Sequence, residues 1–273
     1  MDSFSGKVAV VTGGAAGVGL GMAQAFGEVG MRVVVADIDE PELATAVTTL
    51  TELGVDALGV VTDVADARAV DRLRDATYEQ FGTAHVLCNN AGTGASSPLP
   101  EPIDVAVWDR ILAIDFFSIL YGLNAFLPRM REQGEGHVVN TSSRQGLIAS
   151  PGQGPYPAAK AASVALSEML RDELAAIGSP IGVSVLTPGG VRTKPILTAL
   201  ANHRADPQAN PTMLEFLESR VAAAVEPLEL GRLVVRAVRE NVLYVNTHRE
   251  TLEWLQDRVD RMVADADALG TLR

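Results

Sequence analysis

The residues with the clearest capacity for chemistry are a tyrosine and a lysine four positions apart. Tyr156 and Lys160 lie in the stretch GQGPYPAAKAASVA, residues 152–165, which has the pattern of a helix start. Positions i and i+4 share one helical face, so the phenol and the ammonium can meet in one small volume. A cation a few Å away favours the phenolate, which suits a group that exchanges protons with a substrate. An isolated pair with this spacing is more often a solvated helix pair, so the surrounding motifs must decide.

Several other motifs accompany this pair in a fixed order. They are TGGAAGVG at residues 12–19, NNAG at residues 89–92, Ser143 thirteen residues before Tyr156, and PGGVRT at residues 188–193. In this order and spacing they resemble the short-chain dehydrogenase/reductase family, over residues 5–195. The resemblance implies hydride transfer between a nicotinamide dinucleotide and a carbonyl carbon, with Tyr156 as the proton carrier. It also implies that Ser143, selected over Ser142 by the spacing to Tyr156, holds the substrate oxygen, while Lys160 binds the nicotinamide ribose.

The glycine motif predicts a cofactor site. Gly13, Gly17 and Gly19 follow an apolar run, and a helix begins among them, near Val18. A phosphate can reach the N–H groups of that helix start only where no Cβ blocks the approach. The resemblance adds contacts to the adenine from Asp63 and Val64, to the ribose from Asn90, Ala91 and Gly92, and to the nicotinamide carboxamide from Val191 and Thr193.

Asp37, at the end of the second apolar run, predicts which cofactor binds. A carboxylate at this position can accept both ribose hydroxyls and would repel a 2′-phosphate. Helix capping is the alternative role, but Asp39, with Pro41 shortly after it, is the better cap. NAD is therefore the expected cofactor.

Two residues depart from the family pattern. The segment WDRILAID ends in Asp115, where the family usually has Asn, so the expected catalytic set is Asp115, Ser143, Tyr156 and Lys160. At roughly 7 Å from Lys160, an ionised Asp115 would attract the ammonium by about 2 kcal/mol at an effective dielectric of ~20. Two alternatives remain: Asp115 is protonated, or it is turned to bond the backbone of its own helix. Pro157 disfavours the α conformation at Tyr156, so the helix must begin within about one residue of Tyr156.

The elements that must position these residues alternate along the chain. Apolar, mostly β-branched runs occur at residues 8–11, 33–35, 57–61, 86–88, 137–140, 183–186 and 242–245, with helical patterns between them. Continuous apolar runs are typical of strands buried on both faces of a parallel sheet. The sequence therefore predicts an α/β fold, a single Rossmann-like doubly wound domain over residues 1–273 with about seven parallel strands and helices on both faces.

Two segments interrupt this regularity. Residues 194–226 contain several prolines and are expected to form a substrate loop or lid with one or two short helices. Residues 248–269 place apolar side chains at helical spacing and are expected to form an amphipathic C-terminal helix packed against something apolar.

Composition excludes several kinds of partner. The chain has 22 Lys and Arg against 34 Asp and Glu, a net charge of −12, and no basic run, so nucleic acid is not expected to bind. The single cysteine, Cys88, lies in an apolar run and is expected to be buried, and the four scattered histidines predict no metal site. The N-terminus lacks signal-peptide features, which predicts a cytoplasmic protein. The apolar stretch 111–127 is interrupted by Asp115 and Asn124 and is shorter than the ~20 residues of a membrane span.

The expected activity is that of an NAD-dependent alcohol dehydrogenase or ketone reductase acting on a secondary alcohol or ketone. A hydrophobic small molecule is the expected substrate because the lid segment carries the apolar residues Ile196, Leu197, Leu200, Met213, Leu214 and Phe216. The alternatives are a non-catalytic dinucleotide sensor and an NADP-dependent biosynthetic ketoreductase. The resemblance also implies a homo-oligomer paired through helices 104–131 and 156–177, a homodimer or homotetramer, with the tail helix favouring the dimer.

Overall fold

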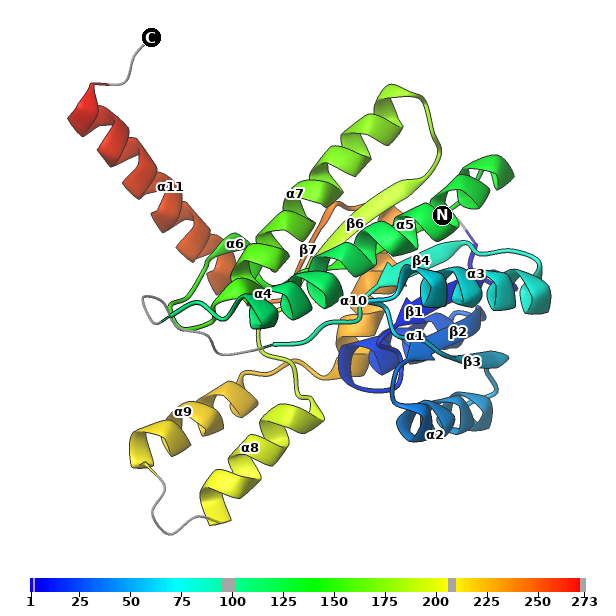
Figure 1. Cartoon of the computed structure of the whole chain (residues 1–273), viewed down its shortest axis with the longest axis horizontal. Helices are drawn as coiled ribbons and strands as arrows, with labels where there is room; N and C mark the ends of the chain where they lie inside the picture. The colour runs from blue at the N-terminus through cyan, green and yellow to red at the C-terminus, as the bar shows by residue number, and fades with distance from the viewer. Residues whose placement is uncertain (2, 95–101, 206–209, 271–273) are drawn as a thin grey trace.

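The centre of the protein is one parallel β-sheet (Figure 1). A computed structural model describes residues 1, 3–94, 102–205 and 210–270. The sheet has seven strands in the order β3-β2-β1-β4-β5-β6-β7, and each neighbouring pair is parallel. The strands are β1 (Val8–Thr12), β2 (Arg32–Asp37), β3 (Ala57–Val61), β4 (Val86–Asn89), β5 (His137–Thr141), β6 (Gly182–Thr187) and β7 (Tyr244–Asn246). The predicted fold class is confirmed.

Helices cover both faces of this sheet. Helices α1 (Gly17–Glu28), α2 (Glu40–Glu52) and α10 (Pro227–Glu240) pack on one face, and α3 (Ala67–Phe81), α5 (Ser118–Gln133) and α7 (Pro155–Ala176) on the other. Successive residues of β1 point to opposite faces: Ala9 and Val11 join the first core, Val8 and Val10 the second. This explains why the strands are continuously apolar.

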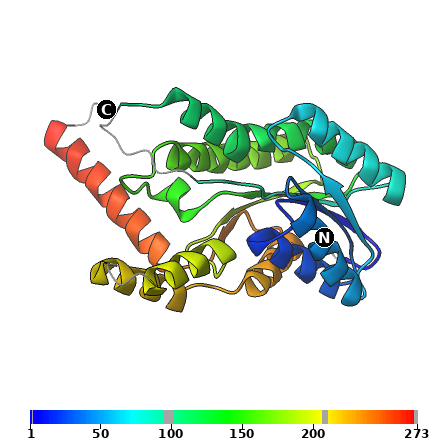
Figure 2. The same cartoon turned by 60° about the horizontal axis from the view of Figure 1, so that its bottom comes forward.

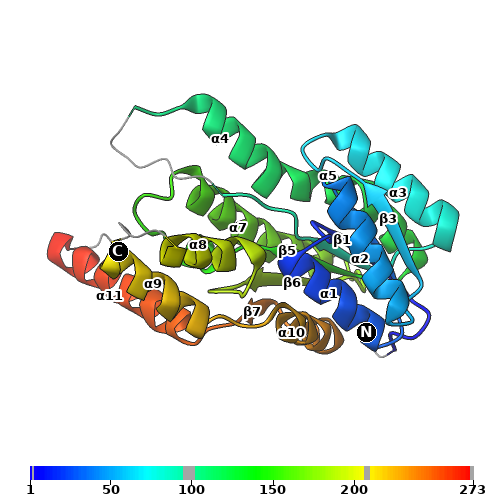
Figure 3. The same ribbon diagram turned by 90° about the horizontal axis from the view of Figure 1, so that it is seen from below.

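Helices α1 and α10 lie side by side, and glycines allow their close approach (Figure 3). A Cβ on Gly21 would lie 2.2 Å from the Pro227 carbonyl oxygen, and one on Gly231 would lie 2.2 Å from the Gly21 carbonyl oxygen. These contacts fix α1, and with it the glycine turn, against the rest of the molecule.

The order of the strands determines where a ligand can bind. The chain direction across the sheet reverses between β1 and β4, and all the strands end at the same edge. In open α/β sheets the crevice outside this reversal, at the carboxyl ends of the strands, is the usual ligand site. Most of the predicted chemical residues follow strand ends or lie in the first turns of helices at this edge, and Asp115 comes from the middle of a helix.

The predicted helix at residues 104–131 is one continuous helix with a π-helical turn inside it. It consists of α4 (Val105–Leu112), the π turn η1 (Ala113–Phe117) and α5. Within the described ranges, Val105–Gln133 is the one helix that passes a length and hydropathy test for a membrane span. Its residues Ile119, Phe126 and Met130 are buried in the second core, as expected for a helix that covers a sheet.

Three further segments frame the sheet edge. The short helix α6 (Arg144–Leu147) follows β5, and α7 begins at Pro155, as the Pro157 argument required. The predicted lid contains two helices, α8 (Lys194–Ala205) and α9 (Pro211–Ala222), which together project from the body of the molecule (Figures 1 and 2).

The tail forms the predicted helix, α11 (Glu250–Leu269), and most of its apolar side is not packed against the body of the same chain. The helix extends away from the sheet (Figures 1 and 2), and among its residues Thr251 alone is buried. Met262 is 61% exposed and Leu269 is 86% exposed. The helix leaves the body after its first turns, so most of its apolar side chains remain exposed.

Candidate active site

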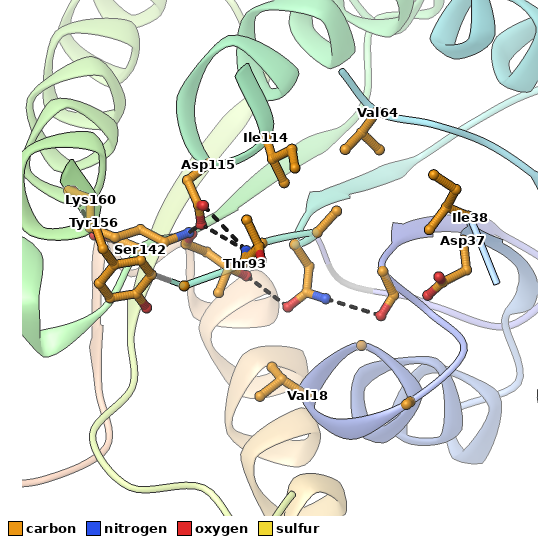
Figure 4. A pocket seen from close by; sticks show the side chains of 18 of the residues that line it. Val18, Asp37, Ile38, Val64, Thr93, Ile114, Asp115, Ser142, Tyr156 and Lys160 are labelled. Atoms are coloured by element: carbon orange, nitrogen blue, oxygen red, sulfur yellow. Dashed lines mark hydrogen bonds and ion pairs between the residues drawn. The ribbon is translucent and has the colours of Figure 1, made fainter. Parts of the chain in front are cut away.

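A groove of about 790 Å³ lies at the carboxyl ends of the strands (Figure 4). It brings together thirteen residues that the sequence singled out. Gly17, Ser143 and Val191 were also predicted but are not part of the groove lining. The thirteen are Gly13, Val18, Gly19, Asp37, Asp63, Val64, Asn90, Ala91, Gly92, Asp115, Tyr156, Lys160 and Thr193.

The glycine turn between β1 and α1 forms the floor of the groove. Gly13 and Gly17 have φ of +63° and +52°, a region that L side chains rarely adopt. A Cβ on Gly19 would lie 2.0 Å from the Gly13 carbonyl oxygen, so the turn can close only with glycine there. The N-cap residue of α1, Ala16, offers no side-chain acceptor to the first N–H groups. The turn thus provides a tight cradle beside the start of a helix, which fits a diphosphate group.

Asp37 marks the other end of the groove. Its Oδ2 accepts a hydrogen bond from the Ala15 N–H at 3.1 Å, and its Oδ1 accepts one from the Asp39 N–H at 3.2 Å. Asp39 caps α2 by accepting from the Glu42 N–H at 3.1 Å, which confirms the predicted helix cap. Asp37 is therefore held with its carboxylate facing the groove, as Figure 4 shows.

A smaller hollow adjoins the groove at Asp37. It is lined by Ala15, Ala16, Asp37, Asp39, Glu42, Lys194 and Thr198. The Lys194 ammonium, at the start of α8, forms an ion pair with Glu42 at 2.5 Å. Three carboxylates thus face this hollow, and the ammonium on its wall is already paired.

Tyr156 and Lys160 lie on one face of α7, as their spacing predicted. Tyr156 is in the first turn of the helix, and the Lys160 Nζ is 5.6 Å from the centre of the Tyr156 ring. Both side chains enter the same end of the groove (Figure 4).

Asp115 makes a direct ion pair with Lys160. The Lys160 Nζ is 2.8 Å from Asp115 Oδ1 and donates a second hydrogen bond, of 3.1 Å, to the Thr141 carbonyl oxygen. The side chains of Asp115 and Lys160 are 0% and 3% exposed. The expected separation of roughly 7 Å was wrong, and so was the alternative in which Asp115 bonds its own helix. The π turn η1 carries Asp115 and turns its side chain to the groove, where the Thr93 N–H also donates to both carboxyl oxygens.

Burial raises the pKa of Asp115, while the Lys160 ammonium and the Thr93 N–H oppose that rise. In each of these contacts the carboxyl group is the acceptor, at 2.8 Å from Lys160 and at 3.2 and 3.3 Å from Thr93. The contact of 2.8 Å with the Lys160 ammonium is an ion pair, which favours the ionised form of the carboxyl group. We therefore treat Asp115 as ionised.

The two serines after β5 have different partners. The Ser142 hydroxyl donates to the Lys160 carbonyl oxygen at 2.7 Å and so ties β5 to α7. The Ser143 hydroxyl oxygen accepts from the Gln145 N–H at 3.1 Å and caps α6, and Ser143 is 7% exposed. The bond to Gln145 uses a lone pair of Ser143 and not its proton.

The Asn90 side chain connects the ends of three strands. Its Nδ2 donates to the Thr12 carbonyl oxygen at 2.9 Å, and its Oδ1 accepts from the Thr141 hydroxyl at 3.2 Å. The Asn90 and Ala91 N–H groups both donate to the Thr12 hydroxyl oxygen. Asn90 thus holds the floor of the groove through its side chain.

The groove also contains residues that the sequence reasoning missed. Arg110 and Ile114 lie four positions apart on the helix that carries Asp115, and this helical spacing could have placed them on the groove side. Gln153 lies in the Tyr156 stretch, and Thr93 directly follows the NNAG motif. The apolar residues of the lid do not line the groove, and the Phe216 side chain lies outside the described part of the structure.

The described residues contain no group of three or more His, Cys, Asp or Glu side chains that could hold a metal ion. Cys88 is buried in the sheet, and burial raises the pKa of its thiol, as expected for a packing residue.

Comparisons with known proteins agree with this geometry. Residues 7–203 match the family described as short chain dehydrogenase. A C alpha-dehydrogenase from Sphingobium sp. (strain NBRC 103272 / SYK-6) is 34% identical over 273 residues, which cover 96% of this chain and 87% of that protein.

Two solved structures are similar over nearly the whole chain. One is a short chain dehydrogenase/reductase from Burkholderia phymatum in complex with NAD, with 34% identity, a TM-score of 0.86 and 97% of each chain covered. The other is L-sorbose reductase from Gluconobacter frateurii complexed with NADPH and L-sorbose, with 27% identity, a TM-score of 0.82, and 90% of this chain and 97% of that chain covered. Similar proteins therefore bind either nicotinamide dinucleotide.

Proposed function

The chain belongs to the short-chain dehydrogenase/reductase family, and we propose that it is an NAD-dependent enzyme that interconverts a secondary alcohol and a ketone. The observation that carries this proposal is the convergence of Tyr156 and Lys160 on a groove with Asp37 at its far end. The reaction requires a proton carrier beside a cation. The cofactor NAD requires a carboxylate at the end of the groove that holds the adenosine ribose.

The residues that line the groove suit the parts of a nicotinamide dinucleotide. The glycine turn and the start of α1 would hold the diphosphate, because a side chain at Gly19 would collide with Gly13. Asp37 would accept the hydroxyls of the adenosine ribose, and Lys160 would bind those of the nicotinamide ribose. The remaining contacts would come from Asp63 and Val64 to the adenine, from Asn90, Ala91 and Gly92 to the ribose, and from Val191 and Thr193 to the carboxamide.

The hollow beside Asp37 supports NAD over NADP. A 2′-phosphate on a ribose bound by Asp37 would enter this hollow, which shares Ala16 and Asp37 with the groove. Asp37, Asp39 and Glu42 would repel it, and the Lys194 ammonium that could attract it is paired with Glu42 at 2.5 Å. The charges at this end of the groove therefore favour the cofactor without the extra phosphate.

When bound, the nicotinamide ring supplies or accepts the hydride at the carbonyl carbon. In alcohol oxidation the Tyr156 phenolate takes the hydroxyl proton, and in ketone reduction the Tyr156 phenol returns it. The Ser143 hydroxyl donates a hydrogen bond to the same substrate oxygen and stabilises the charge that develops there. Lys160 stabilises the phenolate, and Asp115 and Thr141 hold the ammonium in position.

The apolar side chains of the lid favour a hydrophobic substrate. We take residues 1–273 as one catalytic domain in which the segment 194–226 would move over the substrate end of the groove when a substrate binds. Leu197 and Met213 of this segment are 38% and 46% exposed, so they are available to contact an apolar substrate when the lid lies over Tyr156.

The proposal extends to the setting of the enzyme. We propose a cytoplasmic enzyme that forms a homo-oligomer. The helices expected to pair expose the apolar side chains Val105, Phe117 and Met169, which fits an interface between copies. The net charge of −12 does not favour nucleic acid as a partner.

One experiment separates this proposal from its alternatives. NADH and NADPH binding is measured by fluorescence, and absorbance at the nicotinamide band is then followed with a panel of secondary alcohols. We expect tighter binding of NADH and turnover of apolar alcohols. Binding without turnover would instead indicate a dinucleotide sensor, and a preference for NADPH would indicate a biosynthetic ketoreductase.

A further inference from the structure

Helix α11 carries a regular apolar seam. Its members follow one another at intervals of three and four residues in strict alternation. This repeat of 3.5 residues is the a and d pattern of a coiled coil, in which two helices pack along a shared stripe. The α11 seam consists of Leu252, Leu255, Val259, Met262, Ala266 and Leu269.

The body of the protein leaves four of the six seam residues exposed, while Leu255 and Ala266 are partly buried. Leu252 and Val259 are 46% and 43% exposed, and Met262 is 61% exposed. The contacts that attach α11 to the body come from residues outside the seam. Arg258 Nη1 donates to the Leu147 carbonyl oxygen at 2.8 Å, and the Arg144 guanidinium lies 5.4 Å from the Trp254 ring centre.

A helix with an exposed apolar seam lacks its main source of stability. Isolated helices are marginal in water because forming the first turn is costly, and tertiary packing of an apolar face supplies most of their stability. Beyond its first turns α11 extends away from the sheet (Figure 1), and Val259, Met262 and Leu269 of its seam are exposed. The seam therefore requires an occupant.

We propose that the occupant is α11 of a second copy of this chain, in an antiparallel two-stranded coiled coil. In this arrangement each seam residue faces one seam residue of the second copy, and none is left over. Val259 faces Met262 of the second copy, Leu255 faces its Ala266, and Leu252 faces its Leu269. A hollow at the base of the helix, lined by Arg249, Leu252, Glu253 and Gln256, lies where that leucine arrives.

The charges beside the seam select the antiparallel orientation. Positions that flank the seam on one side face each other in pairs, which places Arg258 opposite Asp265 of the second copy. The two-fold symmetry of the pair repeats this contact, so two opposite-charge pairs form. A parallel pair would place Arg258 opposite Val263 and would form neither.

The same charges argue against a lipid surface. Between residues 250 and 269 the helix has six acidic side chains and two arginines. Helices that lie on membranes are rich in Lys and Arg on their polar face, because the lipid surface is anionic. An acidic helix with a narrow a/d seam fits a second helix instead.

Substitutions on α11 test the interface through the mass of the assembly, measured by size-exclusion chromatography with light scattering. Met262→Glu places a charge in the seam and Arg258→Glu replaces attraction by repulsion, so each should lower the wild-type mass to that of the assembly held by the remaining interfaces. Arg258→Glu combined with Asp265→Arg should restore it. Arg261→Glu, on the same helix but away from the seam, is the control and should leave the mass unchanged. A wild-type mass for Met262→Glu would overturn the proposal.

Crosslinking tests the orientation. Cys88 is buried, so a thiol introduced on α11 is the reactive one for a short bis-maleimide. Leu252→Cys mixed with Leu269→Cys should give crosslinked pairs that contain one chain of each kind, and neither variant alone should crosslink. Crosslinking of Leu252→Cys with itself would contradict the antiparallel arrangement. NADH binding by these variants should equal that of wild type, so the outcome is independent of the proposed activity.

Discussion

Replacing Asp115 by Asn removes one charge from the centre of the proposed active site and almost no volume. The carboxylate is 2.8 Å from the Lys160 ammonium, which in turn is 5.6 Å from the centre of the Tyr156 ring. The carboxylate thus partly cancels the positive field that favours the phenolate. An asparagine at this position would keep an oxygen for Lys160 but would no longer oppose that field.

The size of the effect follows from these distances. The carboxylate oxygen can be no farther from the ring centre than the two distances of 2.8 Å and 5.6 Å laid end to end, about 8.4 Å. At an effective dielectric of ~20, a unit charge at this separation repels a phenolate by about 2 kcal/mol. One pH unit corresponds to about 1.4 kcal/mol, so the shift is about 1.5 units before solvent screening and roughly one unit after it.

The assay is the pH profile of alcohol oxidation at saturating NAD. Oxidation needs the phenolate, so the acidic limb should move by about one unit to lower pH in Asp115→Asn while activity persists. Asp109→Asn is the matched control, because it makes the same chemical change on the exposed side of α4 and should not move the limb. An acidic limb within about 0.2 units of wild type for Asp115→Asn would refute the argument.

Three other predictions concern the cofactor groove and the buried histidine. In a fluorescence titration, Asp37→Ala should weaken NADH binding and reduce the difference in affinity between NADH and NADPH. An unchanged preference would show that other residues determine the cofactor selectivity. Gly19→Ala should lower the unfolding free energy by about 1–3 kcal/mol in a denaturant titration, because its Cβ would meet the Gly13 carbonyl oxygen. The same substitution should weaken NADH binding. A wild-type NADH affinity would contradict the role of the glycine turn as the diphosphate site. Burial lowers the pKa of His137 to about 3, below the unfolded value of about 6.5. The unfolded chain alone then takes up this proton, so the stability that His137 contributes should fall by about 1.4 kcal/mol per unit as pH drops below 6.5. An NMR titration that shows His137 protonated in the folded chain at pH 5 would contradict this predicted loss of stability.

The strands and the Tyr156 helix could be predicted from the sequence because local patterns determine them. Continuous apolar runs marked strands buried on both faces, and the first strand ends one residue beyond the predicted run, at Thr12. Asp39 could be separated from Asp37 because Pro41 follows it at the position typical of a helix start, and the structure has the capping hydrogen bond from Glu42. Pro157 limited where α7 could begin, and the helix begins at Pro155.

Features that depend on contacts distant in sequence could not be predicted. The Asp115 to Lys160 distance depends on the π turn, which no pattern in residues 113–117 indicates. The use of the Asn90 side chain to join strand ends depends on β1, β4 and β5 meeting at one edge. The apolar seam of α11 was visible in the sequence, but its spacing does not say whether the same chain or another molecule covers it.

The central claim is that Tyr156 carries the proton in a nicotinamide-dependent reaction. The most direct measurement is turnover of the best secondary alcohol by Tyr156→Phe, together with its NADH dissociation constant. Positioned acid/base groups contribute ~10²–10⁴-fold, so the variant should lose at least about a hundredfold in kcat. Its NADH affinity should stay within a few fold of wild type, and the remote Tyr244→Phe should keep full activity. Tyr156→Phe retaining more than about a tenth of wild-type turnover would contradict the account.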